Sequence, residues 1–157
     1  MTESTMTATV ELVDDMAFQA ETGSGHSLVM DAAPEAGGGD CGPRPMELLL
    51  AGLGGCTGMD VISMLRKMRQ DVTGYEVHLR GERASDHPKI FTSITVEHVV
   101  RGRGLNPESV RRAVELSATR YCSAAAMLGK VAHIEESYRI IDHATGREQT
   151  GALPLVA

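Results

Sequence analysis

Cysteine is the residue type in this chain with the clearest capacity for chemistry. The 157-residue sequence contains three, at Cys41, Cys56 and Cys122. No two of them form a C-x-x-C spacing, which argues against a zinc ribbon and against a thioredoxin-like pair. A thiol of low pKa beside a second thiol is the arrangement that a peroxide-reducing dithiol requires. The competing interpretation is that each cysteine is a small apolar side chain in the core.

Glycines surround Cys56, at positions 52, 54, 55 and 58. Each costs a helix interior about 1 kcal/mol relative to alanine, so their presence needs a reason. Two explanations are open. In one, a helix breaks at Gly54-Gly55, which would place Cys56 at a helix N-terminus where the dipole lowers a thiol pKa. Alternatively, another part of the backbone packs very closely there, and a buried thiol then needs a cationic or hydrogen-bonding partner. Cys122 lies near the start of a short predicted helix of its own.

The elements that must position these thiols follow from periodicity. Apolar residues at three- and four-residue spacing predict a helix from Met46 to Gln70 that is apolar on most sides, as in a buried central helix. Asn106-Pro107-Glu108 is typical of a helix start, with Asn as the N-cap, and a second short helix spans Cys122–Leu128. Alternation and turn residues predict strands at Ala8–Val13, Met16–Ala20, Ser27–Asp31, Thr73–Glu82, Ile90–Arg101 and Ala132–Ile141.

This order of elements indicates an α+β fold in which consecutive strands pair antiparallel. We predict one domain, with a core at about residues 8–141 and a peripheral tail at 142–157. The Gly/Pro-rich stretch Ala32–Pro45 is a loop, too short and too early to link two domains.

Composition and charge argue against several classes of function. The formal net charge is −6 and the pI about 5.5, and an acidic surface repels phosphate backbones, so we expect no nucleic-acid partner. No run approaches the ~18 consecutive apolar residues of a membrane helix, and the N-terminus lacks the features of a signal peptide. We therefore expect a cytoplasmic protein with no membrane partner. His98 and His133 are predicted strand residues, and we expect no metal site and no cofactor.

Three segments together resemble the family of osmotically induced protein C and organic hydroperoxide resistance proteins (OsmC/Ohr). They are Gly42-Pro43-Arg44-Pro45-Met46-Glu47-Leu48, Gly54-Gly55-Cys56 and Tyr121-Cys122-Ser123, with Cys56 11 residues after Pro45 and 66 before Cys122. The resemblance spans about Ala8 to Ile141. It implies antiparallel sheets packed around a buried central helix, in an intertwined homodimer with its sites at the subunit interface.

The resemblance also implies a mechanism. Cys56 would be the peroxidatic thiol, attacking an organic hydroperoxide to give a sulfenic acid and an alcohol. Cys122 would resolve the sulfenic acid to a disulfide, which a dithiol reductant such as a lipoyl protein would reduce. Cys41 has no family counterpart and is interpreted as a small side chain in a glycine-rich loop.

The chain departs from the family pattern at two places. The activating Glu of the family directly follows the proline, whereas here that position is Met46 and the acid is Glu47, about 100° further round a helix. Glu47 is thus a candidate catalyst or simply a first-turn acid. The family also uses an Arg from the N-terminal sheet, and no Arg precedes Arg44.

Arg44, between two prolines that stiffen its position, is the preferred substitute, with Arg120 as the other. The chain looks most like a divergent branch with Pro-Met-Glu and Gly-Gly-Cys. The predicted catalytic set is Cys56, Cys122, Glu47 and Arg44. The alternative function is a non-catalytic small-molecule-binding or thiol-sensing stress protein on the same dimeric fold.

Overall fold

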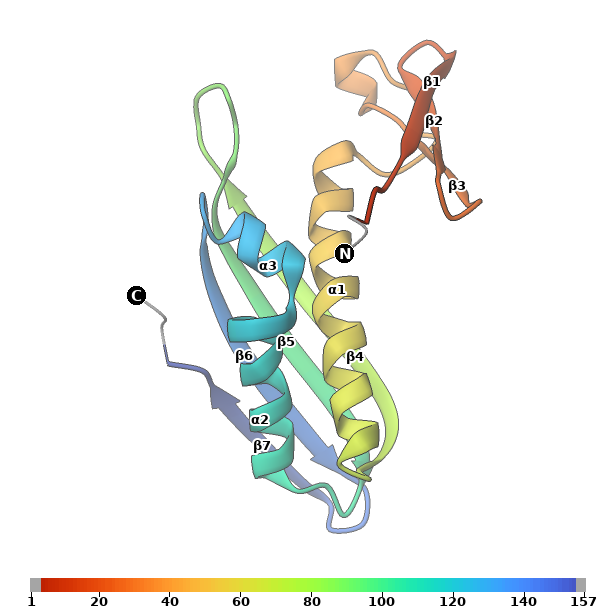
Figure 1. Ribbon diagram of the computed structural model, residues 1–157. Coiled ribbons are helices and arrows are strands. Elements are labelled where there is room, and N and C mark those ends of the chain that lie inside the picture. The colour runs from red at the N-terminus through yellow and green to blue at the C-terminus, as the bar shows by residue number, and fades with distance from the viewer. Residues whose placement is uncertain (1–3, 155–157) are drawn as a thin grey trace. The chain divides into compact units, whose positions relative to one another are not determined.

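The computed structural model describes residues 4–154 (Figure 1). By its internal contacts the chain divides into two compact units, Met1–Leu49 and Leu50–Ala157. The helices are η1 (Pro34–Ala36), α1 (Pro45–Lys67), α2 (Pro107–Leu116), η2 (Ser117–Tyr121) and α3 (Ser123–Leu128). The strands are β1 (Ala8–Asp14), β2 (Ala17–Thr22), β3 (Ser27–Met30), β4 (Asp71–Arg83), β5 (Phe91–Arg103), β6 (His133–Asp142) and β7 (Arg147–Ala152).

The first unit is an antiparallel meander of β1, β2 and β3 followed by a loop. The loop is held by Asp31, a buried carboxylate that accepts hydrogen bonds from the backbone N–H groups of Ala32, Gly39 and Cys41. These hydrogen bonds, above all the one from Cys41, lower the pKa of Asp31. An ionised Asp31 therefore fixes the backbone that leads into α1.

The second unit contains a four-stranded sheet in the order β4-β5-β6-β7. The predicted strand positions are confirmed to within a few residues, but two details of the layout were wrong. β5 and β6 pair in parallel, because the helices between them carry the chain back to the same end of the sheet, as a parallel connection requires. The tail also supplies an unpredicted strand, β7, which pairs with β6 at the edge.

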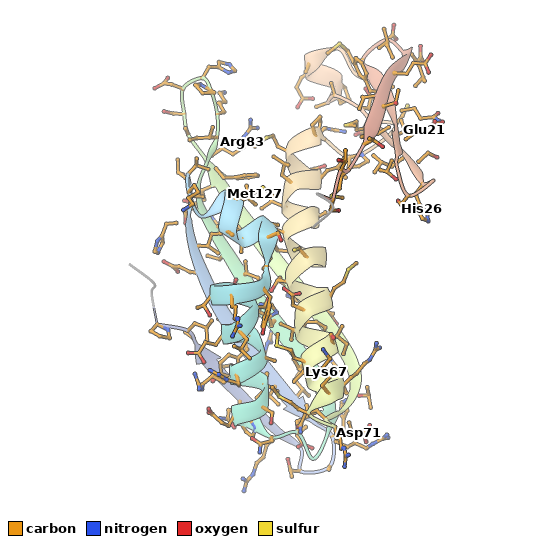
Figure 2. All side chains as sticks on the ribbon, viewed as in Figure 1. Glu21, His26, Lys67, Asp71, Arg83 and Met127 are labelled. Carbon is orange, nitrogen blue, oxygen red and sulfur yellow. The ribbon has the colours of Figure 1, made fainter. Side chains whose placement is uncertain are left out.

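All three α-helices lie over one face of this sheet (Figure 1). A single core joins the two longer ones to the strands. From α1 it takes Val61 and Leu65, from α2 Val110, Ala113 and Val114, and from the strands Val100, Tyr138 and Ile140. Lys67 and Asp71 mark the turn that leads from α1 back into β4 (Figure 2).

Helix α1 runs unbroken through its glycines. Of the two alternatives for Gly54-Gly55, the helix break is therefore wrong, and Cys56 does not lie at a helix N-terminus. The close approach at Gly54 is made by a side chain, since a Cβ there would come within 2.6 Å of Leu79 Cδ1 of β4. At Gly52 and Gly55 a Cβ would meet nothing within 4 Å. Gly54 therefore allows close packing against β4, whereas Gly52 and Gly55 leave another side of the helix without side-chain bulk.

The buried face of α1 is narrower than the sequence suggested. Its buried residues are Leu53, Gly54, Thr57, Val61 and Leu65, whereas Met59 is 73% exposed. By length and composition alone α1 could also cross a membrane, a test that core helices of other proteins pass as well.

The N-terminus of α2 confirms the predicted cap. Asn106 Oδ1 accepts hydrogen bonds from the N–H groups of Glu108 and Ser109, and Pro107 occupies the first helical position. Helix α2 then widens into the π-helical turn η2, and the chain leaves this turn directly into Cys122 and α3. Cys122 therefore lies at the junction between this turn and α3.

Candidate functional site

Cys56 and Cys122 come from separate elements of the second unit. Cys56 is half-buried in the middle of α1. Cys122 is buried, at 3% exposure, and forms the N-cap of α3, where its sulfur accepts a hydrogen bond of 3.3 Å from the N–H of Ala125. Both are free thiols, so the chain is described in its reduced form.

The structure brings these two thiols together. Burial is the largest cause that raises the pKa of Cys122, to about 12, and interactions with Cys56 and Asp60 act in the same direction, against the opposing effect of the Ala125 N–H. The pair therefore has unequal members, because Cys122 is the thiol that its surroundings keep protonated.

A buried polar contact holds the two segments in register. Thr57, next to Cys56 on α1, lies 2.8 Å from Ser117 in η2, oxygen to oxygen, and both side chains are fully buried. Ser117 also donates a hydrogen bond of 3.0 Å to Asp60 Oδ2, one turn further along α1. Since the Ser117 hydroxyl has one proton and gives it to Asp60, Thr57 must donate to Ser117.

Sequence reasoning missed this contact. Thr57 and Ser117 are 60 residues apart, and neither belongs to a recognisable motif. The one available signal was a hydroxyl at a position of the buried face, where an apolar residue was expected.

A second buried network crosses the sheet. Tyr75 of β4 lies 2.6 Å from Nδ1 of His98 of β5, through its hydroxyl oxygen, and His98 Nε2 lies 2.8 Å from Glu136 Oε2 of β6. The side chain of His98 is wholly buried and that of Glu136 is 6% exposed. His98 was predicted to be a strand residue, which is confirmed, but its two partners were not predicted.

Arg44 and Glu47 belong to the first unit, where both act on the start of α1. The backbone N–H of Arg44 donates to Glu47 Oε2 at 2.9 Å, as in a helix capping box. The guanidinium of Arg44 donates to Asp40 at 2.6 Å and to the carbonyl of Gly42, and Asp40 raises its pKa. The geometry thus accounts for Glu47 as a first-turn acid, one of its two predicted roles.

Two other groups complete the description. The thiol of Cys41 is exposed and donates a weak hydrogen bond to the carbonyl of Gly39 at 3.6 Å. Within residues 4–154 no group of three or more His, Cys, Asp or Glu side chains is placed to hold a metal ion. The arrangement that can do chemistry is the dithiol pair.

Comparison with known proteins identifies the family. The family described as OsmC-like protein matches residues 37–137, a span that contains Cys56, Cys122 and both buried networks. The chain belongs to the OsmC family.

Relatives agree with this assignment. The chain is similar to Protein YhfA of Escherichia coli strain K12, at 44% identity over 87% of this chain and 98% of that protein. A solved structure of a hypothetical protein from Aquifex aeolicus VF5 has 31% identity and a TM-score of 0.77, covering 87% of this chain and 96% of that one. An organic hydroperoxide resistance protein from Legionella pneumophila shares the fold, with a TM-score of 0.66 at 16% identity over 88% and 98% of the two chains.

The raised pKa of Cys122 can be measured. In a Cys41→Ser/Cys56→Ser protein, Cys122 is the one thiol left, and its pKa should fall because the contribution of Cys56 is gone. It should still stay above its ordinary value of 9.0, since burial is the largest cause of the shift. Thiolate absorbance near 240 nm against pH measures this, with the triple serine variant as the tyrosinate baseline. Ionisation of Cys122 below pH 9 in the folded protein would contradict the burial argument.

Proposed function

We propose that this OsmC-family protein is a thiol-dependent peroxidase that reduces organic hydroperoxides. The observation that carries the proposal is the contact between two unequal thiols, one of them held protonated by burial. This difference supports the roles that the family resemblance implies, with Cys56 as the attacking thiolate and Cys122 as the resolving thiol.

The first step is a displacement at oxygen. The Cys56 thiolate attacks the terminal oxygen of the hydroperoxide, an S–O bond forms, and the O–O bond breaks. The sulfur is oxidised to a sulfenic acid, and the departing alkoxide takes a proton and leaves as the alcohol. The proton arrangement at Cys122 favours this order, because its S–H stabilises negative charge on the neighbouring sulfur.

The second step uses the same contact. The sulfur of Cys122 attacks the Cys56 sulfenic sulfur, a disulfide forms, and the expelled hydroxide takes the Cys122 proton and leaves as water. A dithiol reductant, such as a lipoyl protein, returns both thiols by exchange.

One observation favours the alternative function, a non-catalytic binding or thiol-sensing protein. Arg44, the substitute for the family's Arg, is already engaged by Asp40 and by the Gly42 carbonyl. Glu47 is engaged at the helix start. In a sensor, Cys56 would react with peroxide only slowly, and the disulfide would alter binding rather than complete a catalytic cycle.

Mixing the reduced protein with a stoichiometric amount of cumene hydroperoxide should form an intramolecular Cys56–Cys122 disulfide, because the thiols are already in contact. Peptide mapping by mass spectrometry identifies the linkage. The Cys41→Ser variant should give the same bridge, and Cys122→Ser should instead accumulate a sulfenic acid that dimedone labels at Cys56. Linkage through Cys41, or no linkage, would defeat the dithiol mechanism.

We propose that Arg44 supplies the cation for the Cys56 thiolate. Arg44→Ala should then slow the reaction of Cys56 with cumene hydroperoxide about tenfold, because a hydrogen bond to a charged group contributes about 1.5 kcal/mol. Arg103→Ala is the matched control, since Arg103 pairs with Asp71 at the far end of β4. Equal rates for the wild type and Arg44→Ala would remove Arg44 from the site and strengthen the sensor alternative.

We further propose that the protein is a homodimer with α1 at its interface. The exposed side of α1 carries Met59 at 73% exposure, beside glycines at which a Cβ would meet nothing. An apolar helix face with so little bulk lets a second helix approach closely. Burying such a face favours association through the hydrophobic effect.

Sedimentation velocity at micromolar concentration should therefore give a dimer. Met59→Glu should dissociate it, because a charge in an apolar interface is costly. Met127→Glu, at a methionine of similar exposure (69%) on α3, should leave it intact. A stable, folded wild-type monomer at this concentration would refute the dimer.

A further inference from the structure

A pocket of about 510 Å³ lies in the second unit between α3, β6 and the segment that follows β7. Its walls are mostly small and apolar, formed by Ala118, Ala125, Ala126, Ala132, Ile134 and Leu153. Glu136 also lines it, and Lys130 and His133 are exposed on its rim. A pocket with apolar walls and few polar groups is the usual form of a small-molecule site.

Glu136 is the unusual member of this pocket. Its side chain is 6% exposed and its Oε2 is bonded to His98, but Oε1 is buried and has no hydrogen-bond partner within residues 4–154. The Leu153 N–H donates to the Glu136 carbonyl at 2.9 Å, which holds the segment after β7 beside this residue. A buried carboxylate oxygen without a donor is rare, since its desolvation is not compensated.

The network behind Glu136 has a consistent proton arrangement. Burial and the nearby carboxylates of Glu136 and Asp60 raise the pKa of Tyr75, so its hydroxyl keeps its proton. When this hydroxyl donates to His98 Nδ1, neutral His98 carries its proton on Nε2 and donates to a carboxylate oxygen, Oε2 of Glu136. In that arrangement Oε1 is a buried acceptor to which the network brings no donor.

We propose that this pocket binds a small organic cation, a primary ammonium on a compact apolar body. The ammonium would supply to Glu136 Oε1 the N–H donor that it lacks. The apolar body would lie against the alanines, Ile134 and Leu153. A charged donor suits this acceptor better than a neutral one, because it both completes the hydrogen bonds and compensates the buried negative charge.

The proposal does not depend on thiol chemistry. Neither cysteine lines the pocket, so Cys56→Ser should retain binding even if it abolishes reaction with peroxide. A negative result for one proposal therefore does not count against the other.

The test is a titration of the full chain with butylammonium, followed by amide chemical shifts in ¹H–¹⁵N spectra. We expect saturable shifts at Ala126, Gly129 and Ile134, with a dissociation constant in the millimolar range as for other ligands of this size. Butan-1-ol, which has the same apolar body without the charge, should bind at least about tenfold more weakly, because it makes no charge-assisted contact.

Two substitutions locate the site. Glu136→Gln keeps the shape and an amide oxygen for His98 but removes the charge, and should weaken butylammonium at least about tenfold. The control is Glu135→Gln on the same strand, whose side chain is 55% exposed, and it should change affinity less than twofold by the same reasoning. Ala126→Leu, which fills the pocket and leaves the network intact, should also weaken binding.

Three outcomes would overturn the proposal. These are no saturable shift with butylammonium, equal binding of butylammonium and butan-1-ol, and unchanged affinity in both Glu136→Gln and Ala126→Leu.

Discussion

The packing of the second unit depends on one row of buried residues along α1. Leu53, Thr57, Val61 and Leu65 recur every fourth position and are fully buried, so a single stripe of the helix must lie on the sheet. Gly54 beside this stripe has no side chain, which admits Leu79 of β4. Cys56 adjoins the stripe at its edge, and this position leaves its thiol half-buried and reachable by Cys122.

Thr57 is the one polar member of the stripe, and it connects core packing to the site. A fully buried hydroxyl must be hydrogen-bonded, and its partner is Ser117 in η2. The π-helical turn places Ser117 there, and the chain then enters Cys122 directly. The position of Cys122 thus follows from satisfying the hydroxyl of the residue next to Cys56.

The sequence predicted those features that depend on local signals. The strands followed from alternation, and the start of α2 followed from Asn106 and Pro107. It left open whether α1 breaks at Gly54-Gly55, because propensity counts the cost of glycine but not the packing against Leu79 that offsets it. Two further features depend on contacts between residues far apart in the sequence, which the pattern of a single strand does not contain. They are the parallel pairing of β5 with β6 and the partners of His98. The proximity of Cys56 and Cys122 came from family resemblance, since 66 residues of sequence impose no distance.

The buried state of Cys122 makes two opposite demands on the proposed cycle. Before peroxide arrives, burial keeps this thiol protonated, so that it donates to Cys56 and does not compete as a nucleophile. To form the disulfide it must lose that proton, and burial makes this loss costly. The order of steps reconciles the two demands. The base that accepts the proton is the hydroxide expelled from the Cys56 sulfenic acid, which is generated at the sulfur that Cys122 attacks. A high pKa at Cys122 therefore restrains the second thiol until the first has been oxidised.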